Sequence, residues 1–242
     1  MFFGKDVFGG LARQVSIVVT VALASVGGAA AEDAENTVVY FGGDGVRNGV
    51  GVYGGFTYAL NGDIATSGWV ISANMGYATF WSPGSTSYTF DASVLLGYQW
   101  HTPDYYLALN LGGDFISNVD TPPTAGPAMG QKVGVIGQVG FETKASEAIY
   151  LSGFGAYATA NQRIYGQVRV GYQDANYYTY GVEGIYGNEL GSSPVTRIGV
   201  FVGGIEVGPG AVGVSVGYLD EWGSTVNDGA YLAVEYSVPL RF

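Results

Sequence analysis

The stretch Ser87–Trp100, SYTFDASVLLGYQW, alternates almost without error between apolar and polar residues. One face carries Tyr88, Phe90, Ala92, Val94, Leu96, Tyr98 and Trp100. The other face carries Thr89, Asp91, Ser93, Gly97 and Gln99, with Leu95 as the exception. Because successive side chains of a strand point to opposite faces, this pattern predicts a β-strand with one apolar and one polar wall. Aromatic residues stand at both ends of the apolar face, as in strands that cross an outer membrane.

The same alternation recurs along the chain and predicts twelve strands, an even number as in bacterial outer-membrane barrels. Their expected ranges are 36–43, 48–59, 68–79, 87–100, 105–116, 131–142, 149–158, 163–173, 178–187, 195–206, 211–219 and 229–242. These lengths suit a tilted crossing, which takes about 9–11 residues. We therefore predict an all-β fold, an antiparallel transmembrane β-barrel. A soluble β-sandwich is the alternative, since its strands alternate as well.

The composition speaks against an ordinary soluble enzyme. Only 12% of the 242 residues are charged and 41 are Gly, whereas soluble domains average about 25% charged residues and about 7% Gly. The net charge of −11 disfavours nucleic acid as a partner, because phosphates repel an acidic protein. With no Cys and one His, the chain predicts no disulfide, no metal site and no cofactor.

Residues 1–31 have the features of a cleavable signal peptide. Lys5 and Arg13 give a positive start, and Ala29–Ala31 match the small-residue cleavage rule. Between them, residues 15–26 form an apolar core that is too short to span a bilayer, which takes about 20 residues. A retained anchor is the alternative. We expect cleavage after Ala31, which leaves residues 32–242 as a single barrel domain in the outer membrane.

The lengths of the connections predict an orientation with both termini in the periplasm, since outer-membrane barrels have short periplasmic turns and longer external loops. The expected periplasmic turns lie near 61–63, 101–104, 144–147, 174–176 and 208–210, and the expected external loops at 117–130, 188–194 and 220–228. A short connection near 160–162 departs from the rule.

Several motifs occur in a characteristic order: YFGGD at 40–44, YGGFTYALNG at 53–62, GW at 68–69, LGYQW at 96–100, GVE at 181–183, GN at 187–188 and RIG at 197–199. In order and spacing they resemble the BcsS-type cellulose biosynthesis family of Gram-negative bacteria. The residues that carry the resemblance include Asp44, Gly181, Glu183, Gly187, Asn188 and Arg197. One position departs from the family pattern, which has Pro where Val182 stands. The resemblance implies an outer-membrane barrel associated with cellulose or components of the cellulose synthase complex, and it implies no catalytic residue.

Seven charged residues and one amide on the polar faces of the strands are expected to line the lumen: Asp91, Lys132, Arg163, Gln167, Arg169, Glu183, Arg197 and Glu235. Opposite charges can pair across the lumen and fill it, or they can line a narrow passage. Glu183 and Arg197 lie on adjacent predicted strands, so we predict that they form a structural ion pair.

Other polar residues are interpreted as structural. His101 is expected in a solvated turn, Asp44 in a loop and Glu142 at a turn. Asp220 and Glu221 resemble a paired-carboxylate site, but neighbours in sequence rarely flank a sugar, so we interpret both as solvated loop residues. No catalytic residue is predicted.

Three functions are compatible with these patterns. The first is an accessory barrel for cellulose biosynthesis or export, which the family resemblance supports. The second is a general small porin. The third is a surface barrel for adhesion or carbohydrate binding, with Trp81 and Trp222 as sugar platforms.

The chain ends in an alternating segment whose apolar face carries Tyr236, Val238, Leu240 and the terminal Phe242. A terminal aromatic residue on such a strand resembles the tag that the barrel-assembly machinery recognises, which makes that machinery an expected partner. Deletion of Phe242 should therefore lower the yield of folded barrel, measured by its heat-modifiable mobility in electrophoresis. An unchanged folded yield at normal expression would contradict the interpretation of these residues as a tag.

Overall fold

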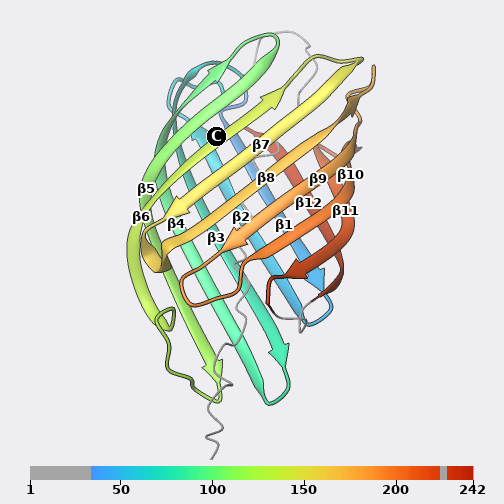
Figure 1. Ribbon diagram of the computed structural model, residues 1–242. Helices are drawn as coiled ribbons and strands as arrows, with labels where there is room; N and C mark the ends of the chain where they lie inside the picture. The colour runs from blue at the N-terminus through green and yellow to red at the C-terminus, as the bar shows by residue number, and fades with distance from the viewer. Residues whose placement is uncertain (1–33, 224–227, 242) are drawn as a thin grey trace, which may run out of the picture.

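The computed structural model describes residues 34–223 and 228–241, so the predicted signal peptide and Phe242 lie outside the described residues. The chain forms a closed antiparallel barrel of twelve strands (Figure 1). The strands are β1 (Thr37–Val46), β2 (Gly49–Ala59), β3 (Gly68–Ser82), β4 (Ser85–His101), β5 (Tyr105–Thr121), β6 (Gly130–Thr143), β7 (Ala148–Ala158), β8 (Arg163–Gln173), β9 (Thr179–Asn188), β10 (Val195–Val207), β11 (Gly210–Glu221) and β12 (Gly229–Leu240). A single 3-10 turn, η1 (Ala160–Gln162), joins β7 to β8. Among the described residues, no helix is long and apolar enough to cross a membrane.

Each strand pairs with its neighbours in sequence, and the first strand pairs with the last. The seam between β1 and β12 runs from Thr37 opposite Leu240 to Val46 opposite Tyr231. Because the ring closes, no strand leaves a free edge of unpaired backbone groups. The predicted fold class, an antiparallel barrel, is confirmed, and the alternative, a soluble β-sandwich, is not the fold.

Several strands are longer than predicted, and β3, β4 and β5 are the longest of all. β3, β4 and β5 contain 15, 17 and 17 residues. The β3–β4 hairpin and the β5–β6 connection project beyond the rest of the wall at the end opposite the start of β1 and the end of β12, the two described ends of the chain that we call the termini (Figure 1). Residues 117–121 therefore belong to β5 and not to a loop. The connections Arg47-Asn48 and Pro83-Gly84 contain only two residues each, so the predicted difference in length between the two ends does not hold there.

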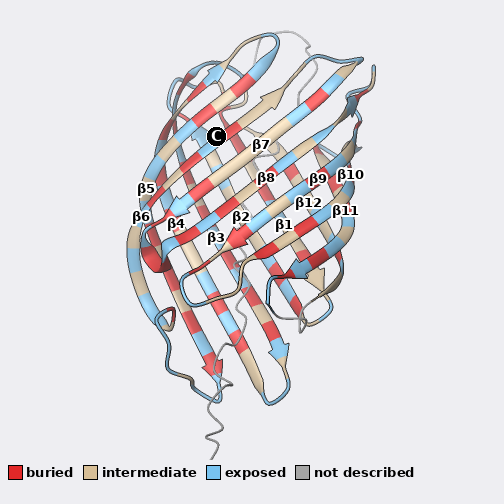
Figure 2. Cartoon of the chain, viewed as in Figure 1, coloured by how far each residue is buried: buried red, intermediate tan, exposed pale blue. Residues whose placement is uncertain are grey.

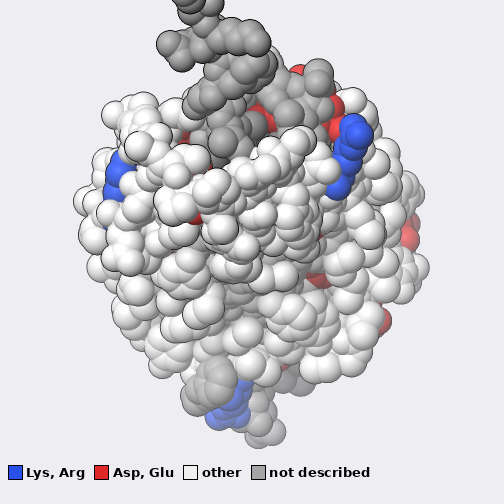
Figure 3. All heavy atoms as spheres, turned by 90° about the horizontal axis from the view of Figure 1, so that it is seen from below, with Lys and Arg blue, Asp and Glu red and all other residues white. Residues whose placement is uncertain are grey.

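The wall is apolar outside and polar inside, with exposed and buried residues alternating along each strand (Figure 2). On β4, Val94 is 61% exposed and Leu96 is 50% exposed, whereas Leu95 between them is 1% exposed. Leu95 breaks the polar pattern because it packs inside the barrel against Ile136 and Ala158. Seen from the lower end of Figure 1, charged residues occupy isolated spots among uncharged atoms (Figure 3).

Exposed aromatic residues form a girdle at each end of the wall. Those near the end with the termini include Tyr58, Trp69, Trp100, Tyr105, Tyr172 and Tyr180, and those near the other end include Trp81, Tyr88, Tyr157, Tyr186, Tyr218 and Trp222. Trp222 packs against Tyr186, with ring centroids 6.4 Å apart, and its indole N–H donates to Thr196 Oγ1. Such belts are typical of the two interfaces of a membrane. Trp81 and Trp222, which were expected as sugar platforms, therefore belong to the girdle that faces the membrane interface.

Glycine allows a close approach of two strands in the wall. Gly181 of β9 lies directly opposite Gly171 of β8. A Cβ added at Gly181 would lie 2.2 Å from the backbone oxygen of Val170 and 2.5 Å from Gly171 Cα. Gly184 on the same strand is exposed, and a Cβ there would meet nothing within 4 Å.

This contrast predicts that Gly181→Ala destabilises the barrel by about 1–3 kcal/mol, because backbone atoms must shift to admit the methyl group. The measurement is urea unfolding of the barrel in detergent. The matched control, Gly184→Ala, should leave the free energy of unfolding within about 0.5 kcal/mol of wild type. Equal effects of the two substitutions would contradict the close approach.

Candidate functional site

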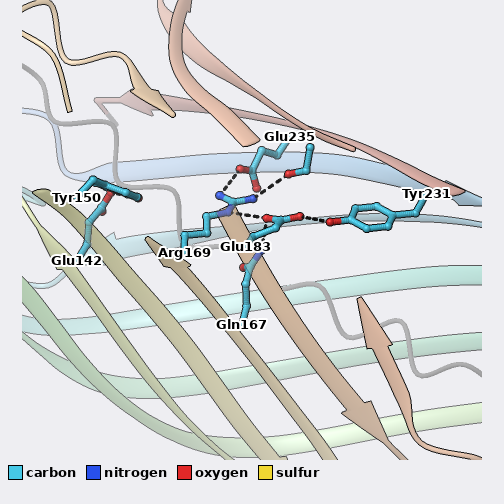
Figure 4. A network of polar contacts seen from close by, with 8 residues as sticks. Glu142, Tyr150, Gln167, Arg169, Glu183, Tyr231 and Glu235 are labelled. Atoms are coloured by element: carbon cyan, nitrogen blue, oxygen red, sulfur yellow. Dashed lines mark hydrogen bonds and ion pairs between the residues drawn. The ribbon is translucent and has the colours of Figure 1, made fainter. Parts of the chain in front are cut away.

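The middle of the lumen holds a network centred on Arg169, which projects inward from β8 (Figure 4). Arg169 Nε lies 2.8 Å from Glu183 Oε2, and its Nη1 lies 2.7 Å from Glu235 Oε1. The guanidinium also donates to Ser215 Oγ at 3.4 Å and stacks on the ring of Phe201, 5.0 Å from its centroid. One cation thus connects five strands, from β8 to β12.

Glu183 has further donors that fix both of its carboxylate oxygens. Gln167 Nε2 donates to Oε2 at 3.2 Å, and the Tyr231 hydroxyl donates to Oε1 at 2.7 Å (Figure 4). Glu183 is 3% exposed. A buried carboxylate is tolerated when it has this many partners, since an unpaired charge would be costly.

The prediction that Glu183 and Arg197 form an ion pair is wrong, because each of them pairs with another residue. Both residues lie on the inner wall of adjacent strands, as expected, but Glu183 faces Arg169 directly across β8 and β9. Arg197 lies opposite Ile185 and bonds instead to Asp44, with Nη1 2.6 Å from Oδ2. This second pair crosses the lumen between β10 and β1.

The end of the lumen opposite the termini is covered by a cluster that we name the cap: Asn118, Ala128, Asn161 and Glu189. The Asn118 and Asn161 amides each donate to the Ala128 carbonyl, at 3.0 and 3.1 Å, and to Glu189 Oε1, at 2.8 and 2.5 Å. The four residues are 1–3% exposed. They come from β5, η1 and the loops that follow β5 and β9, so the cap joins three connections at this end of the barrel to one another.

A third ion pair lies beneath the cap. Arg163 Nη2 contacts both carboxylate oxygens of Asp114 at 2.7 Å, and both side chains are almost fully buried. Asp114 stands four residues nearer the middle of β5 than Asn118, so this pair forms a second layer below the cap. The half of the lumen beside the cap therefore contains a buried ion pair and a layer of hydrogen-bonded amide and carboxylate groups.

The other half of the lumen contains a cavity of about 450 Å³ that reaches the end where both chain termini lie. Arg169 and Glu235 form its inner boundary, and Glu35, Asn176 and Pro209 line it near the rim. The residues that line this cavity include none of the cap. The lumen thus has one covered end and one open end.

Several residues interpreted as loop or turn residues belong to the wall. Asp44 lies on β1 and Glu142 on β6, where it accepts a hydrogen bond from the Tyr150 hydroxyl at 2.8 Å. Glu221 is the last residue of β11 and is 2% exposed, so the interpretation of it as a solvated loop residue is wrong. Asp220 is exposed, and its side chain points to the opposite face of the strand.

His101 is also part of the wall, at the end of β4, and not in a turn. Its Nδ1 lies 3.0 Å from Lys144 Nζ, in the turn between β6 and β7. Burial lowers the pKa of Lys144. Because an ammonium group only donates, His101 Nδ1 accepts and the imidazole is neutral when Lys144 is charged.

The remaining predicted residues also lie on the strands of the wall. Gly187 and Asn188 close β9 next to the cap, and Tyr236, Val238 and Leu240 share the outward face of β12. Asp91 and Lys132 have inward positions on β4 and β6. In the part of the chain that the structure describes, no three His, Cys, Asp or Glu residues are grouped so that they could hold a metal ion.

Sequence patterns missed most of the cap and the partner of Arg163. Asp114 could have been found, since it continues the polar face of its strand by two residues beyond Gly112. Asn161 and Glu189 carry no such signal, because they lie between strands. Asn161 adopts a left-handed backbone conformation, with φ 56°, which Asn tolerates better than most residues.

A model of one protein family, described as cellulose biosynthesis protein BcsS, matches residues 38–240. The chain belongs to this family. Two solved structures resemble the BcsS-family barrel. LpxR from Salmonella typhimurium has a TM-score of 0.52 at 9% identity, over 84% of this chain and 100% of that one. The translocator domain of the autotransporter NalP from Neisseria meningitidis has a TM-score of 0.50 at 10% identity, over 90% and 91%.

These two likenesses show the fold alone. None of the curated proteins that were compared with the chain matches it. Fold and family together place this BcsS-family protein in the outer membrane, as predicted.

The Arg169–Glu183 contact predicts strong coupling in a double-mutant cycle. Arg169→Met and Glu183→Gln should each destabilise the barrel, and the double variant should be more stable than the sum predicts by about 1–3 kcal/mol, because each single change leaves a buried charge unpaired. The measurement is urea unfolding in detergent.

Arg163→Met serves as the control, since Arg163 belongs to the layer beneath the cap. Combined with Glu183→Gln, it should give effects that add to within about 0.5 kcal/mol. Additive effects of Arg169→Met and Glu183→Gln would show that this ion pair does not brace the wall.

Proposed function

We propose that this protein is a non-enzymatic accessory of cellulose biosynthesis or export in the outer membrane. Membership of the BcsS family supports the process that it serves. Its expected partners are outer-membrane lipid, the barrel-assembly machinery, and cellulose or components of the cellulose synthase complex. None of these partners is nucleic acid, given the acidic charge of the chain.

The observation that carries this proposal over a general porin is the covered external end of the lumen. Barrels of about 8 strands are filled by side chains, whereas 16–18 strands leave a water-filled channel. Twelve strands lie between these limits, and here the cap and the Arg163–Asp114 pair occupy the external half. A general porin would need an open path at this level.

The non-enzymatic role is supported by how the charged groups of the lumen are used. Arg169, Glu183 and Glu235 bind one another, and Arg197 binds Asp44. His101 contacts Lys144 at the rim, away from these carboxylates. Carboxylates and cations that are tied in pairs brace a wall and leave little free capacity for acid–base chemistry.

Deletion of the gene should reduce the cellulose that the cells display, measured by binding of a cellulose-specific dye, and a plasmid copy should restore it. A strain without cellulose synthase gives the background. The plasmid-borne Gly184→Ala variant, whose change lies in open space on the outer wall, should restore dye binding fully and serves as the matched control.

Two results would contradict the proposal. Dye binding that is unchanged in the deletion strain would remove the link to cellulose. Steady ion conductance of the purified wild-type barrel in planar bilayers would favour a general porin, because the cap should prevent a continuous aqueous path.

A further inference from the structure

The cavity at the open end of the lumen has the size and lining of a ligand site. Its volume of about 450 Å³ lies within the range of about 300–1,000 Å³ that is usual for small-molecule pockets. The inner wall supplies it with apolar and aromatic surface from Phe154, Tyr106 and Tyr150, together with amide and charged groups. It is also distinct from the cap and from the Arg163–Asp114 pair beneath it.

One group in the lining has unused hydrogen-bonding capacity. Gln173, at the end of β8, is 3% exposed, and its Oε1 is buried without a hydrogen-bond partner. A buried carbonyl oxygen without a partner is costly, so a rotation of the Gln173 side chain that turns Oε1 toward the cavity is favoured when a donor is present there. A hydroxyl group of a ligand in the cavity is such a donor.

The charge of the lining excludes one class of ligand. The described residues around the cavity include four glutamates, Glu35, Glu142, Glu206 and Glu235, and a single cationic residue, Arg169. Arg169 is already bound to Glu183 and Glu235. A polyanion would therefore be repelled, whereas a neutral ligand rich in hydroxyl groups could donate to carboxylate and amide oxygens and pack on aromatic faces.

We propose that this cavity binds the end of a neutral oligosaccharide that enters from the side of the chain termini, which is the periplasmic side in the predicted orientation. The inference rests on the proposed function for the identity of the sugar, a β-glucan. It goes beyond that function in assigning a binding site and in placing it on one side of the cap. The barrel then holds a glucan end from the inside and does not conduct it.

The test is isothermal titration of the purified full-length barrel in detergent with cellotetraose. Gln173→Ala should raise the dissociation constant about three- to tenfold, the effect of losing one hydrogen bond. Gln138→Ala is the matched control, because Gln138 is also a buried lumenal glutamine but lines a separate small cavity beside Tyr40 and Asn74. It should leave the dissociation constant unchanged.

A second variant tests the cavity independently of Gln173. A Cβ at Gly140 would have Tyr106 Cε1 as its nearest neighbour, at 3.9 Å, so Gly140→Leu can place its side chain in the cavity. This variant should abolish binding. Folding of every variant is checked by heat-modifiable mobility, so that lost binding is read only from folded barrels.

Tetragalacturonate is the charged comparison probe. The proposal expects it not to bind, because the glutamates of the lining repel a polyanion. Absence of cellotetraose binding to folded wild type, unchanged binding by Gly140→Leu, or equal binding of tetragalacturonate would overturn the proposal. If cellotetraose does not bind but the deletion strain displays less cellulose, the binding site is refuted and the proposed function stands. If cellotetraose binds but the deletion strain displays unchanged cellulose, the proposed function is refuted and the binding site stands.

Discussion

No water reaches the backbone in the hydrocarbon layer of a membrane, so each strand of a spanning sheet must find hydrogen-bond partners on both sides. Twelve strands satisfy this requirement only because β1 pairs with β12. Closure in turn encloses the polar face of every strand in one lumen. There a charge must be paired or it destabilises the wall, and the contacts of Arg169 with Glu183 and Glu235 meet this second requirement.

The cap and the cavity divide this lumen into two halves with different chemistry. On the side of the cap, amide and carboxylate groups bind one another through Asn118, Asn161 and Glu189, and the loop that carries Ala128 is held against them. On the side of the termini, the lumen contains the cavity that Arg169, Glu142 and Gln173 line. The two ends of the lumen therefore differ in chemistry, unlike those of a uniform channel.

The strands and their two faces could be predicted from the sequence, because the period of two residues is local and every segment reports its own orientation. Leu95 stands out in the sequence as the one apolar residue on the polar face of its strand, and only the structure shows the reason, its packing on Ile136. The ion pairs were not predictable in the same way. Register places Arg169 and not Arg197 opposite Glu183, and the partner of Arg197, Asp44, lies on a strand about 150 residues earlier.

The cap was beyond sequence patterns because its residues lie where alternation stops, and because its contacts join three separate connections. The strand ends were uncertain for a related reason. On β5 the apolar Ile116 faces inward and the polar Ser117 takes the outward position, so the polarity pattern is broken just where the strand continues to Thr121, and the sequence gives no signal for its last residues.

The seam between β1 and β12 has a consequence for the order of folding. Every other pairing joins strands that are adjacent in the chain and can form as a hairpin, whereas Thr37 meets Leu240 only after nearly the whole chain has been placed. The entropic cost of closing so long a loop makes such a contact slow. The last step of assembly is therefore zipping of this single seam, and until it forms the sheet is an open ribbon with two unprotected edges.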